Sequence, residues 1–433
     1  MYAESSPRGY GGISTIRISG TETLEILKRI TWVESWPPHK HFFARLRGSE
    51  GALIDQVMAV FHPGPQSYTG EDVAEISCHG NPLLVDTLLD VIHTTHLARL
   101  AQQGEFTRRA YLNAKMDLAQ AEAVGAIISA GSSAGIEMAK SLLDGDLSRS
   151  VEDLDTAILD LLALIEASFI ADDVEITTES IIEAITPILH KIEDLLKDHD
   201  AAPSLLSGIS TTIAGLPNAG KSSLFNAILG YPRAIVHAEG GTTRDIIHEH
   251  VTIEGIDFVF HDTAGIRETS SGPEKIGVEK TIEKLAQSDL VLYVVDAGIG
   301  LQPDEHKWLD LGEKTIVVMN KIDLLDAQPH KSSANDTVWI SAKYGQGIAE
   351  LLGLMTHTVP DTRPKVFIQR HAYLLEKART CLVQAEESAG AGMTADVLTI
   401  DLSHASSFLQ EIIGKEVDED MLNRIFSQFC VGK

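Results

Sequence analysis

Nine consecutive residues, GLPNAGKSS from Gly215 to Ser223, have the glycine spacing and the Lys-Ser pair of a phosphate-binding loop. They follow an apolar run typical of a strand, TTIA, and precede a run typical of a helix, LFNAIL. In such a loop the backbone N–H groups surround the phosphates, and the helix N-terminus favours negative charge. We expect Lys221 to contact the β- and γ-phosphates of a nucleotide, and Ser222 to ligate Mg²⁺.

A second group of residues indicates which base the nucleotide carries. In VVMNKIDLL, the residues Asn320, Lys321 and Asp323 follow a strand-like run. A carboxylate accepts two hydrogen bonds from guanine, through N1–H and the 2-amino group, and adenine has neither donor. ISAK, with Ser341 and Ala342, follows another strand-like run and is similar to the last guanine-contacting element of GTPases. Alone NKID could be a polar turn, but after a phosphate-binding loop it favours guanine.

Two further elements lie between these motifs. HDTAG ends a strand-like run and offers a carboxylate and a glycine N–H to the Mg²⁺ shell and the γ-phosphate, and GGTTRD offers two threonines in a loop. The four elements in this order predict a GTPase. The residues expected at GTP are Asn218, Ala219, Gly220, Lys221, Ser222, Ser223, Thr242, Thr243, Asp262, Thr263, Ala264, Gly265, Asn320, Lys321, Asp323, Ser341 and Ala342.

The catalytic residues depart from the Ras pattern, in which a Gln orients the attacking water and an arginine finger stabilises the transition state. Ile266 follows Gly265 here and cannot orient water. An acid in the next loop, IRETSSGPEKIG, is the natural replacement, either Glu268 or Glu274. Asn218 could offer an oxygen to a monovalent cation beside the phosphates.

These motifs lie in a chain whose composition limits the possible functions. The 433 residues are 44% hydrophobic and suit two to four globular domains. A net charge of −27 excludes a general nucleic-acid binder, so any such contact must be local or shared with a partner. We find no apolar run of transmembrane length and no signal-peptide core. Three widely spaced cysteines form no disulfide framework, which favours a reducing cytoplasm.

Sequence texture predicts a multidomain protein of the α/β and α+β classes. Residues 1–116 mix short strand-like runs with Gly-rich turns and predict an α+β domain. Residues 206–364 alternate strands and helices and predict a Ras-like P-loop GTPase domain with a mostly parallel sheet. Residues 117–205 and 365–433 carry apolar residues at helical spacing. We therefore expect one discontinuous helical domain with the GTPase domain inserted into it.

The motifs together resemble one family, the tRNA modification GTPases called MnmE or TrmE. The resemblance rests on GLPNAGKSSLFNAILG, GTTRD, DTAGIRE, the central insertion and the C-terminal FCVGK. GYGGISTIRISG, SYTGEDVAEISCHGNP, GEFTRRAYLNAKMDLAQAEA and IQRHAYLLEKA also look like blocks of this family. The resemblance covers nearly the whole chain.

The resemblance implies a function for each domain. The N-terminal domain would bind a reduced folate, either 5-formyltetrahydrofolate or methylenetetrahydrofolate, and form a constitutive homodimer. The GTPase domain would hydrolyse GTP with K⁺ stimulation as its two copies meet. A flavoprotein partner, MnmG (GidA), would complete a heterotetrameric or larger complex that acts on tRNA and not at a membrane. The product would be an aminomethyl or carboxymethylaminomethyl group on C5 of the wobble uridine.

The resemblance also implies roles for particular residues. The K⁺ ligands would be Asn218 and the mostly backbone carbonyls of the loop with His237, Glu239 and Thr242, the Mg²⁺ ligands Ser222 and Thr243, the catalytic residue that positions water Glu274, and the folate set Arg17, Glu75, Lys115 and Lys433. It prefers Glu274 to Glu268. Cys430 would lie near the folate pocket without a defined step, and by itself a buried reduced thiol is the commoner role.

Two other functions remain as alternatives. A GTP-driven switch in ribosome assembly, without modification chemistry, shares the GTPase motifs but lacks the N-terminal blocks and FCVGK. A membrane-remodelling GTPase also combines such a domain with helices. The sequence has no basic amphipathic stretch, which counts against that alternative.

Overall fold

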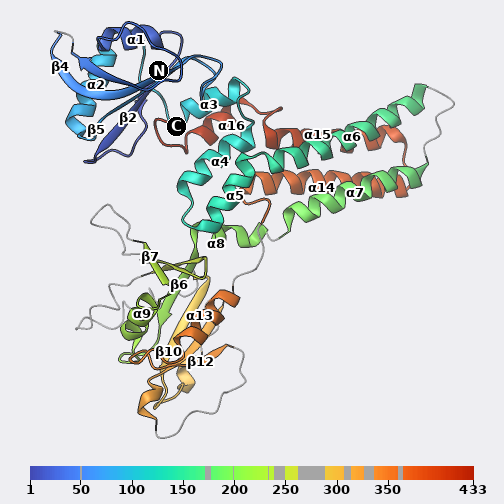
Figure 1. The fold of residues 1–433 in the computed structure, drawn as a ribbon. Coiled ribbons are helices and arrows are strands. Elements are labelled where there is room, and N and C mark those ends of the chain that lie inside the picture. Colours follow the sequence, from blue (N-terminus) through green and yellow to red (C-terminus); the bar gives the residue numbers. More distant parts are fainter. Residues whose placement is uncertain are drawn as a thin grey trace. The chain divides into compact units, whose positions relative to one another are not determined.

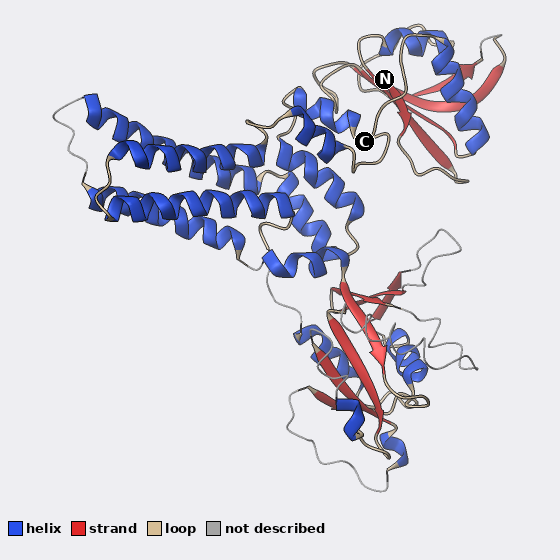
Figure 2. Ribbon diagram, turned by 180° about the vertical axis from the view of Figure 1, so that it is seen from behind, coloured by secondary structure: helices blue, strands red, loops and turns tan. Residues whose placement is uncertain are grey.

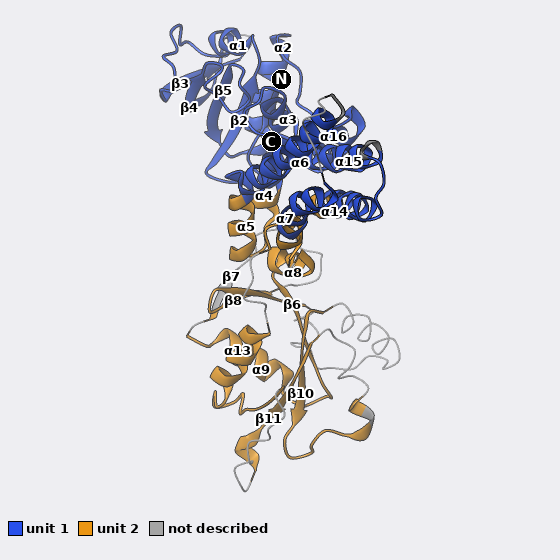
Figure 3. Ribbon diagram, turned by 90° about the vertical axis from the view of Figure 1, so that its right-hand side faces the viewer, with its two compact units in different colours: residues 1–125, 142–191, 373–433 blue, residues 126–141, 192–372 orange. Residues whose placement is uncertain are grey.

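The computed structural model describes residues 1–48, 51–170, 177–197, 199–232, 234–237, 249–261, 288–306, 314–325, 336–358 and 364–433. The chain divides into two compact units. Unit 1 comprises residues 1–125, 142–191 and 373–433, and unit 2 comprises residues 126–141 and 192–372 (Figure 3). Each unit is described by itself.

Unit 1 begins with a five-stranded antiparallel sheet in the order β1-β2-β5-β4-β3. The strands are β1 (Tyr2–Glu4), β2 (Ile13–Ser19), β3 (Phe42–Arg47), β4 (Leu53–His62) and β5 (Val73–His79). Helices α1 (Thr23–Ile30) and α2 (Pro82–Thr94) bury their apolar residues against one face of this sheet (Figure 1). The strands alternate buried and more exposed positions, as expected when one face is covered.

The other face of this sheet carries polar and exposed apolar side chains. Arg17 on β2 lies opposite Glu75 on β5. Met58 on β4 lies opposite Phe43 on β3, and both side chains are exposed, at 44% and 64%. The residues that could bind a ligand are therefore on the face that α1 and α2 leave open.

The helices of unit 1 come from both sides of the inserted domain. Besides α1 and α2, they are α3 (Glu105–Leu112), α6 (Asp146–Ile170), α15 (Ala395–Ile413) and α16 (Glu419–Phe426), with most of α4 (Leu118–Ser129), α7 (Thr178–Leu196) and α14 (Gln369–Gly390). Helix α6 packs against α15 (Figure 1), where the buried carboxylate of Asp155 accepts hydrogen bonds from Ser406 at 2.5 Å and from Gln410. The expected discontinuous helical domain is confirmed.

Unit 2 contains a seven-stranded mixed sheet in the order β12-β11-β10-β6-β9-β8-β7. Its strands are drawn in red in Figure 2. The parallel strands are β6 (Ile209–Ala214), β9 (Ile256–Phe260), β10 (Leu290–Asp296), β11 (Thr315–Asn320) and β12 (Thr337–Trp339). Strands β7 (Ala234–His237) and β8 (Glu249–Ile253) add an antiparallel edge. The predicted mostly parallel sheet is thus confirmed.

Helices complete unit 2. Helix α9 (Lys221–Leu229) and helix α13 (Ile348–His357) bury apolar residues with the sheet, and the apolar run of β10 is almost wholly buried. Helix α8 (Ala202–Ser207) and helix α5 (Ser133–Leu143), most of which belongs to this unit, lie near the start of β6 (Figure 1). Among the described residues, no helix is long and apolar enough to cross a membrane.

Candidate functional site

The phosphate-binding loop lies between β6 and α9, at the carboxyl end of a central parallel strand. Its backbone takes left-handed φ angles at Gly215 (136°), Asn218 (64°) and Gly220 (98°). A side chain at Gly215 would collide with the carbonyl of Val294 on β10, so the tight packing of strand and loop requires glycine there. The loop leads into the N-terminus of α9, and a helix N-terminus favours an anion through its first amides and its dipole.

Lys221 closes this loop on itself. Its Nζ donates hydrogen bonds of 2.9 Å to the carbonyls of Gly215 and Leu216. Burial lowers the pKa of its ammonium group, because the group is partly removed from water. An anionic ligand at the loop would relieve that cost, so the position of Lys221 fits a phosphate site.

Asn320, at the end of β11, connects the loop to the segment after β12. Its Nδ2 donates to the carbonyl of Ala219 at 3.0 Å, and its Oδ1 accepts from the amide of Ala342 at 3.0 Å. The side chain is buried, and Gly220 leaves the space for it, since a Cβ there would collide with Nδ2. Asn320 is therefore a structural clamp between two expected nucleotide-contacting segments.

The expected base-recognition residues are brought together. The hydroxyl of Ser341 donates to Oδ1 of Asp323 at 2.6 Å, and Asp323 is exposed at the same edge of the sheet. Lys321 has a left-handed φ of 67° and pairs with Asp296 at the end of β10. The hydrogen bond from Lys321 holds the pKa of the Asp296 carboxyl below its usual range. Asp296 was not predicted; VVDAG at the end of a strand is the sequence signal that could have identified it.

Several predicted residues lie outside the described residues. These are Glu239, Thr242, Thr243, Asp262, Thr263, Ala264, Gly265, Glu268 and Glu274. His237 ends β7, and only its backbone is described. In the described part of the chain, no group of three or more His, Cys, Asp or Glu residues could hold a metal ion. The predicted Mg²⁺ and K⁺ ligand sets depend largely on residues beyond that part.

Two residues of the predicted folate set lie together on the open sheet face of unit 1. Arg17 and Glu75 form an ion pair of 2.8 Å. The Arg17 guanidinium also lies over the rings of Tyr68 and Phe106, 5.2 and 5.6 Å from their centroids. Lys115 lies on the loop after α3, and its Nζ donates to the carbonyl of Pro65 at 3.0 Å. The aromatic residues were not predicted, and only the motifs SYTGED and GEFTRR pointed to their segments.

An ionic network around the buried carboxylate of Glu105 supports this region. Glu105 is 9% exposed in its side chain and accepts hydrogen bonds from Arg99 and Arg109. Arg109 also pairs with Glu71 at 2.8 Å. Burial raises the pKa of Glu105, but the hydrogen bonds from Arg99, the backbone of Gln102 and Arg109 outweigh it and lower the pKa to about 2. This network holds α3 against the loop before β5.

The last residues of the sequence pack against the start of α3. The amide of Gly104 donates to the carbonyl of Cys430, and the amide of Phe106 donates to a backbone oxygen of Lys433 at 3.1 Å. Phe429 is buried, whereas Cys430 is exposed. The segment therefore reaches the helix that carries Phe106, next to Arg17. The apolar run before FCVGK predicts a helix over about 418–429, but helix α16 ends earlier, at Phe426.

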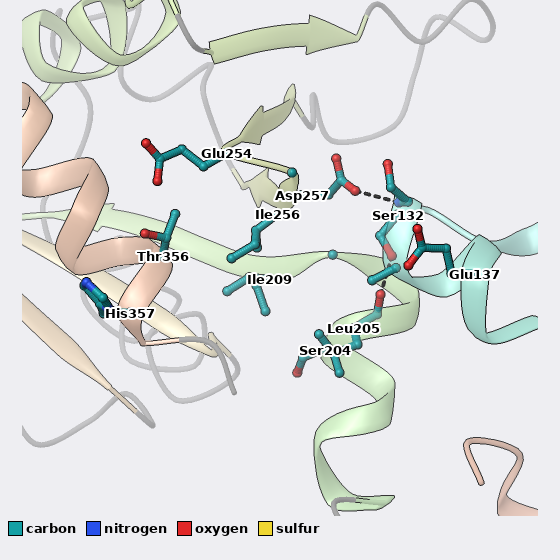
Figure 4. A pocket seen from close by; sticks show the side chains of 14 residues that line it. Ser132, Glu137, Ser204, Leu205, Ile209, Glu254, Ile256, Asp257, Thr356 and His357 are labelled. Atoms are coloured by element: carbon teal, nitrogen blue, oxygen red, sulfur yellow. Dashed lines mark hydrogen bonds between the residues drawn. The ribbon is translucent and has the colours of Figure 1, made fainter. Parts of the chain in front are cut away.

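A separate cavity of about 850 Å³ lies in unit 2, at the amino ends of β6 and β9. Its walls come from the start of α5, the end of α8, the β8–β9 turn and the end of α13 (Figure 4). The buried carboxylate of Asp257 accepts from the amide of Ser133 at 2.7 Å and from the hydroxyl of Thr252. Since the phosphate loop follows the carboxyl end of β6, this cavity is not the nucleotide site. Asp257 joins the β8–β9 hairpin to α5.

The geometry defines a class of protein: a P-loop GTPase domain inserted into a helical domain that follows an N-terminal antiparallel-sheet domain. Sequence comparison agrees at the level of family. Residues 1–115 match the family described as the GTP-binding protein TrmE N-terminus, and residues 118–430 match the MnmE helical domain. The chain belongs to the MnmE (TrmE) family of tRNA modification GTPases.

Full-length relatives support this assignment. The chain is 38% identical to the tRNA modification GTPase MnmE of Carboxydothermus hydrogenoformans, with 100% of this chain and 98% of the relative covered. It is also 38% identical to the protein of the same name from Aquifex aeolicus, covering 100% of this chain and 99% of the relative. The chain is 36% identical to the tRNA modification GTPase MnmE of Thermotoga maritima, with 100% of this chain and 99% of the relative covered.

Proposed function

We propose that this protein hydrolyses GTP and, with a flavoprotein partner of the MnmG (GidA) type, modifies C5 of the wobble uridine of tRNA. The reaction would take a one-carbon unit from a reduced folate and leave an aminomethyl or carboxymethylaminomethyl group. The observation that carries the proposal is full-length family membership combined with a base site in which Ser341 orients the Asp323 carboxylate. We place this work in the cytoplasm, where tRNA is available and free cysteines stay reduced.

Guanine specificity follows from the chemistry of that base site. The Asp323 carboxylate has acceptor oxygens for the N1–H and 2-amino groups of guanine, and the hydrogen bond from Ser341 limits its rotation. Asn320 fixes the distance between this site and the phosphate loop through Ala219 and Ala342. The described residues thus fit a guanine nucleotide with its phosphates at the start of α9.

The metal sites are assigned by family pattern and by position. Ser222 lies in the first turn of α9, beside Lys221, where a hydroxyl can reach a phosphate-bound Mg²⁺, with Thr243 as the second ligand. Asn218 lies within the loop, and with the segment His237–Thr242 it would hold K⁺ close to the phosphates. The cation would supply the positive charge that an arginine finger supplies elsewhere. Glu274 would hold the attacking water.

Folate binding is proposed for the open sheet face of unit 1. The Arg17–Glu75 pair offers both donors and acceptors to a pterin ring, and Tyr68 and Phe106 offer aromatic surfaces beside it. Lys115 and Lys433 would attract the acidic glutamate tail of the folate. These hydrogen-bonding, aromatic and cationic groups therefore fit a reduced folate, which would supply the one-carbon unit when bound.

A homodimer is proposed through the same sheet. Phe43 and Met58 are adjacent, exposed apolar residues on the open face, and Ile13 on β2 is 71% exposed. A second copy of the chain would bury such residues. Within the complex, two copies of this protein would combine with the flavoprotein and tRNA in a heterotetrameric or larger assembly.

The test is mass spectrometry of wobble uridines in tRNA from cells that lack this protein. We expect loss of the C5 aminomethyl or carboxymethylaminomethyl group, and its return on expression of the intact chain. A Lys221→Ala variant, which lacks the phosphate-loop ammonium, should fail to restore the modification. Unchanged wobble uridines in the deletion strain would refute the proposal.

A further inference from the structure

The ion pair between Lys321 and Asp296 lies in unit 2, at the edge of the sheet where the nucleotide is expected. Lys321 follows β11 and Asp296 ends β10, and in these neighbouring parallel strands Asp296 lies opposite Asn320. The Nζ of Lys321 is 2.8 Å from Oδ2 of Asp296, and the two side chains are 30% and 21% exposed. The pair is therefore partly shielded from water.

The Lys321 side chain lies between the phosphate-binding loop and the base site. A Cβ on Gly220 would lie 4.0 Å from Cε of Lys321, so the end of this side chain is beside the loop. Asp323, the residue expected to bind the edge of guanine, follows two residues after Lys321. A nucleotide with its phosphates at the loop and its base at Asp323 therefore passes along the aliphatic part of Lys321.

The carboxylate that holds Lys321 is itself fixed. Oδ1 of Asp296 accepts a hydrogen bond of 3.0 Å from the amide of Gly298, and Oδ2 accepts from Lys321. The carbonyl of Asp296 accepts from the amides of Ile299 and Gly300, at 3.0 and 2.9 Å, which closes a tight turn. The acceptor for the lysine thus has a defined position.

Lys321 also begins from a restricted backbone conformation. Its φ of 67° is left-handed, a region that residues with a side chain rarely adopt. This conformation turns the chain from β11 into the short helix Ile322–Leu324, which carries Asp323. A lysine side chain loses rotamer entropy when it is held in one place. The ion pair with Asp296 makes that loss a part of folding, so it need not accompany nucleotide binding.

We propose that Asp296 is a positioning residue for the guanine nucleotide, because it holds the Lys321 side chain along the base site before the nucleotide arrives. The aliphatic part of Lys321 then offers an ordered apolar surface to the base and the ribose. Asp296 acts through Lys321 and not by contact with the nucleotide. This inference rests on the proposed guanine site and adds a residue to it.

A carboxylate at the opposite end of the same strand provides a matched control. Asp289 accepts a hydrogen bond of 2.8 Å from the amide of Ser210 on β6 and so joins two strands. Asp289→Asn and Asp296→Asn each keep an acceptor oxygen for the backbone amide and remove the charge. Only Asp296 holds Lys321, so only its substitution should change nucleotide affinity.

The test uses the full-length protein. Calorimetry measures the affinity of GDP, and competition with GDP measures that of tripolyphosphate, which has no base and can occupy only the phosphate-binding loop. For Asp296→Asn we expect GDP affinity to fall about fivefold, the cost of ordering one long side chain, and tripolyphosphate affinity to stay at the wild-type value. Lys321→Met, which removes the ammonium, should also weaken GDP binding.

The double variant shows whether Asp296 acts through Lys321. In a Lys321→Met protein, Asp296→Asn should cause no further loss of GDP affinity, because the lysine that it positions is gone. Asp289→Asn should bind both ligands like the wild type, and thermal unfolding checks that each variant folds.

Three results would overturn the positioning role: wild-type GDP affinity in Asp296→Asn, equal losses for GDP and tripolyphosphate, or a further loss in the double variant. If Asp296→Asn does not fold, wild-type GDP affinity in Lys321→Met overturns it. A wild-type protein that binds GDP no better than ADP overturns the proposed guanine site as well.

Discussion

The hydroxyl of Ser341 donates a 2.6 Å hydrogen bond to the carboxylate of Asp323, although the two residues lie on different loops of the nucleotide-binding edge. This contact occupies one lone pair of Oδ1, so both carboxylate oxygens can still accept a hydrogen bond from a base. It also links recognition of the base to the segment that Asn320 clamps.

Asp323→Asn should change the preferred nucleotide. The amide replaces one acceptor oxygen by a donor, so guanine would lose a hydrogen bond and face a repulsive contact. Xanthine has a carbonyl where guanine has its 2-amino group, and it should regain the contact. We expect GTP affinity to fall by at least about a hundredfold and XTP affinity to rise. Nucleotide titration by calorimetry measures both, and equal losses for the two nucleotides would argue against base contact.

Potassium should stimulate GTP hydrolysis relative to sodium, because a cation near Asn218 would offset transition-state charge. We expect a difference on the order of a hundredfold. Asn218 has a left-handed φ of 64°, so a change to alanine would add backbone strain. Asn218→Gly removes the amide without that strain and should still lose the potassium response. Equal rates in the two salts for the wild type would contradict the cation site.

Gly432→Ala should weaken binding of 5-formyltetrahydrofolate. Gly432 has a φ of 94°, and a Cβ there would collide with the carbonyl of Glu4 on β1. The C-terminal segment would shift away from α3, with an affinity loss of about tenfold or more. Gly51→Ala is the control, since it has a φ of 80° with no heavy atom within 4 Å. Intrinsic GTP hydrolysis should survive, and unchanged folate affinity would place Lys433 away from the pocket.

Glu105→Gln should alter the acid stability of unit 1. The pKa of Glu105 lies near 2 in the folded protein and near 4.5 when unfolded, so its ionised form stabilises the fold above pH 4.5. That contribution, at most about 3 kcal/mol, is lost as the pH falls from 4.5 towards 2. The variant should have a lower free energy of unfolding than the wild type at pH 7. This difference should become smaller as the pH falls from 4.5 towards 2. Glu25→Gln changes an exposed ion pair with Arg29, and it should have the same free energy of unfolding as the wild type at pH 7.

Asp257→Ala should loosen the first turn of α5. The carboxylate caps the amide of Ser133, and the loss of a buried cap costs about 1–2 kcal/mol. Hydrogen exchange at the start of α5 should accelerate. Thr252→Val removes only the other partner of Asp257 and should leave this turn protected.

Local patterns predicted more of this protein than long-range ones did. The glycine spacing of the phosphate loop and the apolar runs before NKID and ISAK correctly located β6, β11 and β12. The helical run around Pro187 was also predicted, and α7 accommodates that proline. Such features depend on residues that are close together in the sequence, so glycine spacing and apolar periodicity indicate them directly.

Contacts between distant segments could not be read in this way. Nothing near Asp296 indicates that Lys321 binds it, and nothing near Phe106 indicates that Arg17 lies over its ring. The early end of α16 has a similar cause, since the next residues leave the helix and Phe429 packs against Gly125. Tertiary packing decided these positions.

The pairing of α6 with α15 has a consequence for how the protein is made. During synthesis α6 leaves the ribosome before the whole GTPase domain, and its partner Ser406 follows only afterwards. At a synthesis rate of roughly 5–20 residues per second, the apolar side of α6 remains without its partner α15 for many seconds. The nascent chain would therefore expose a hydrophobic helix while the GTPase domain folds. Chaperone binding at this stage, measurable on stalled ribosomes, is the expected result.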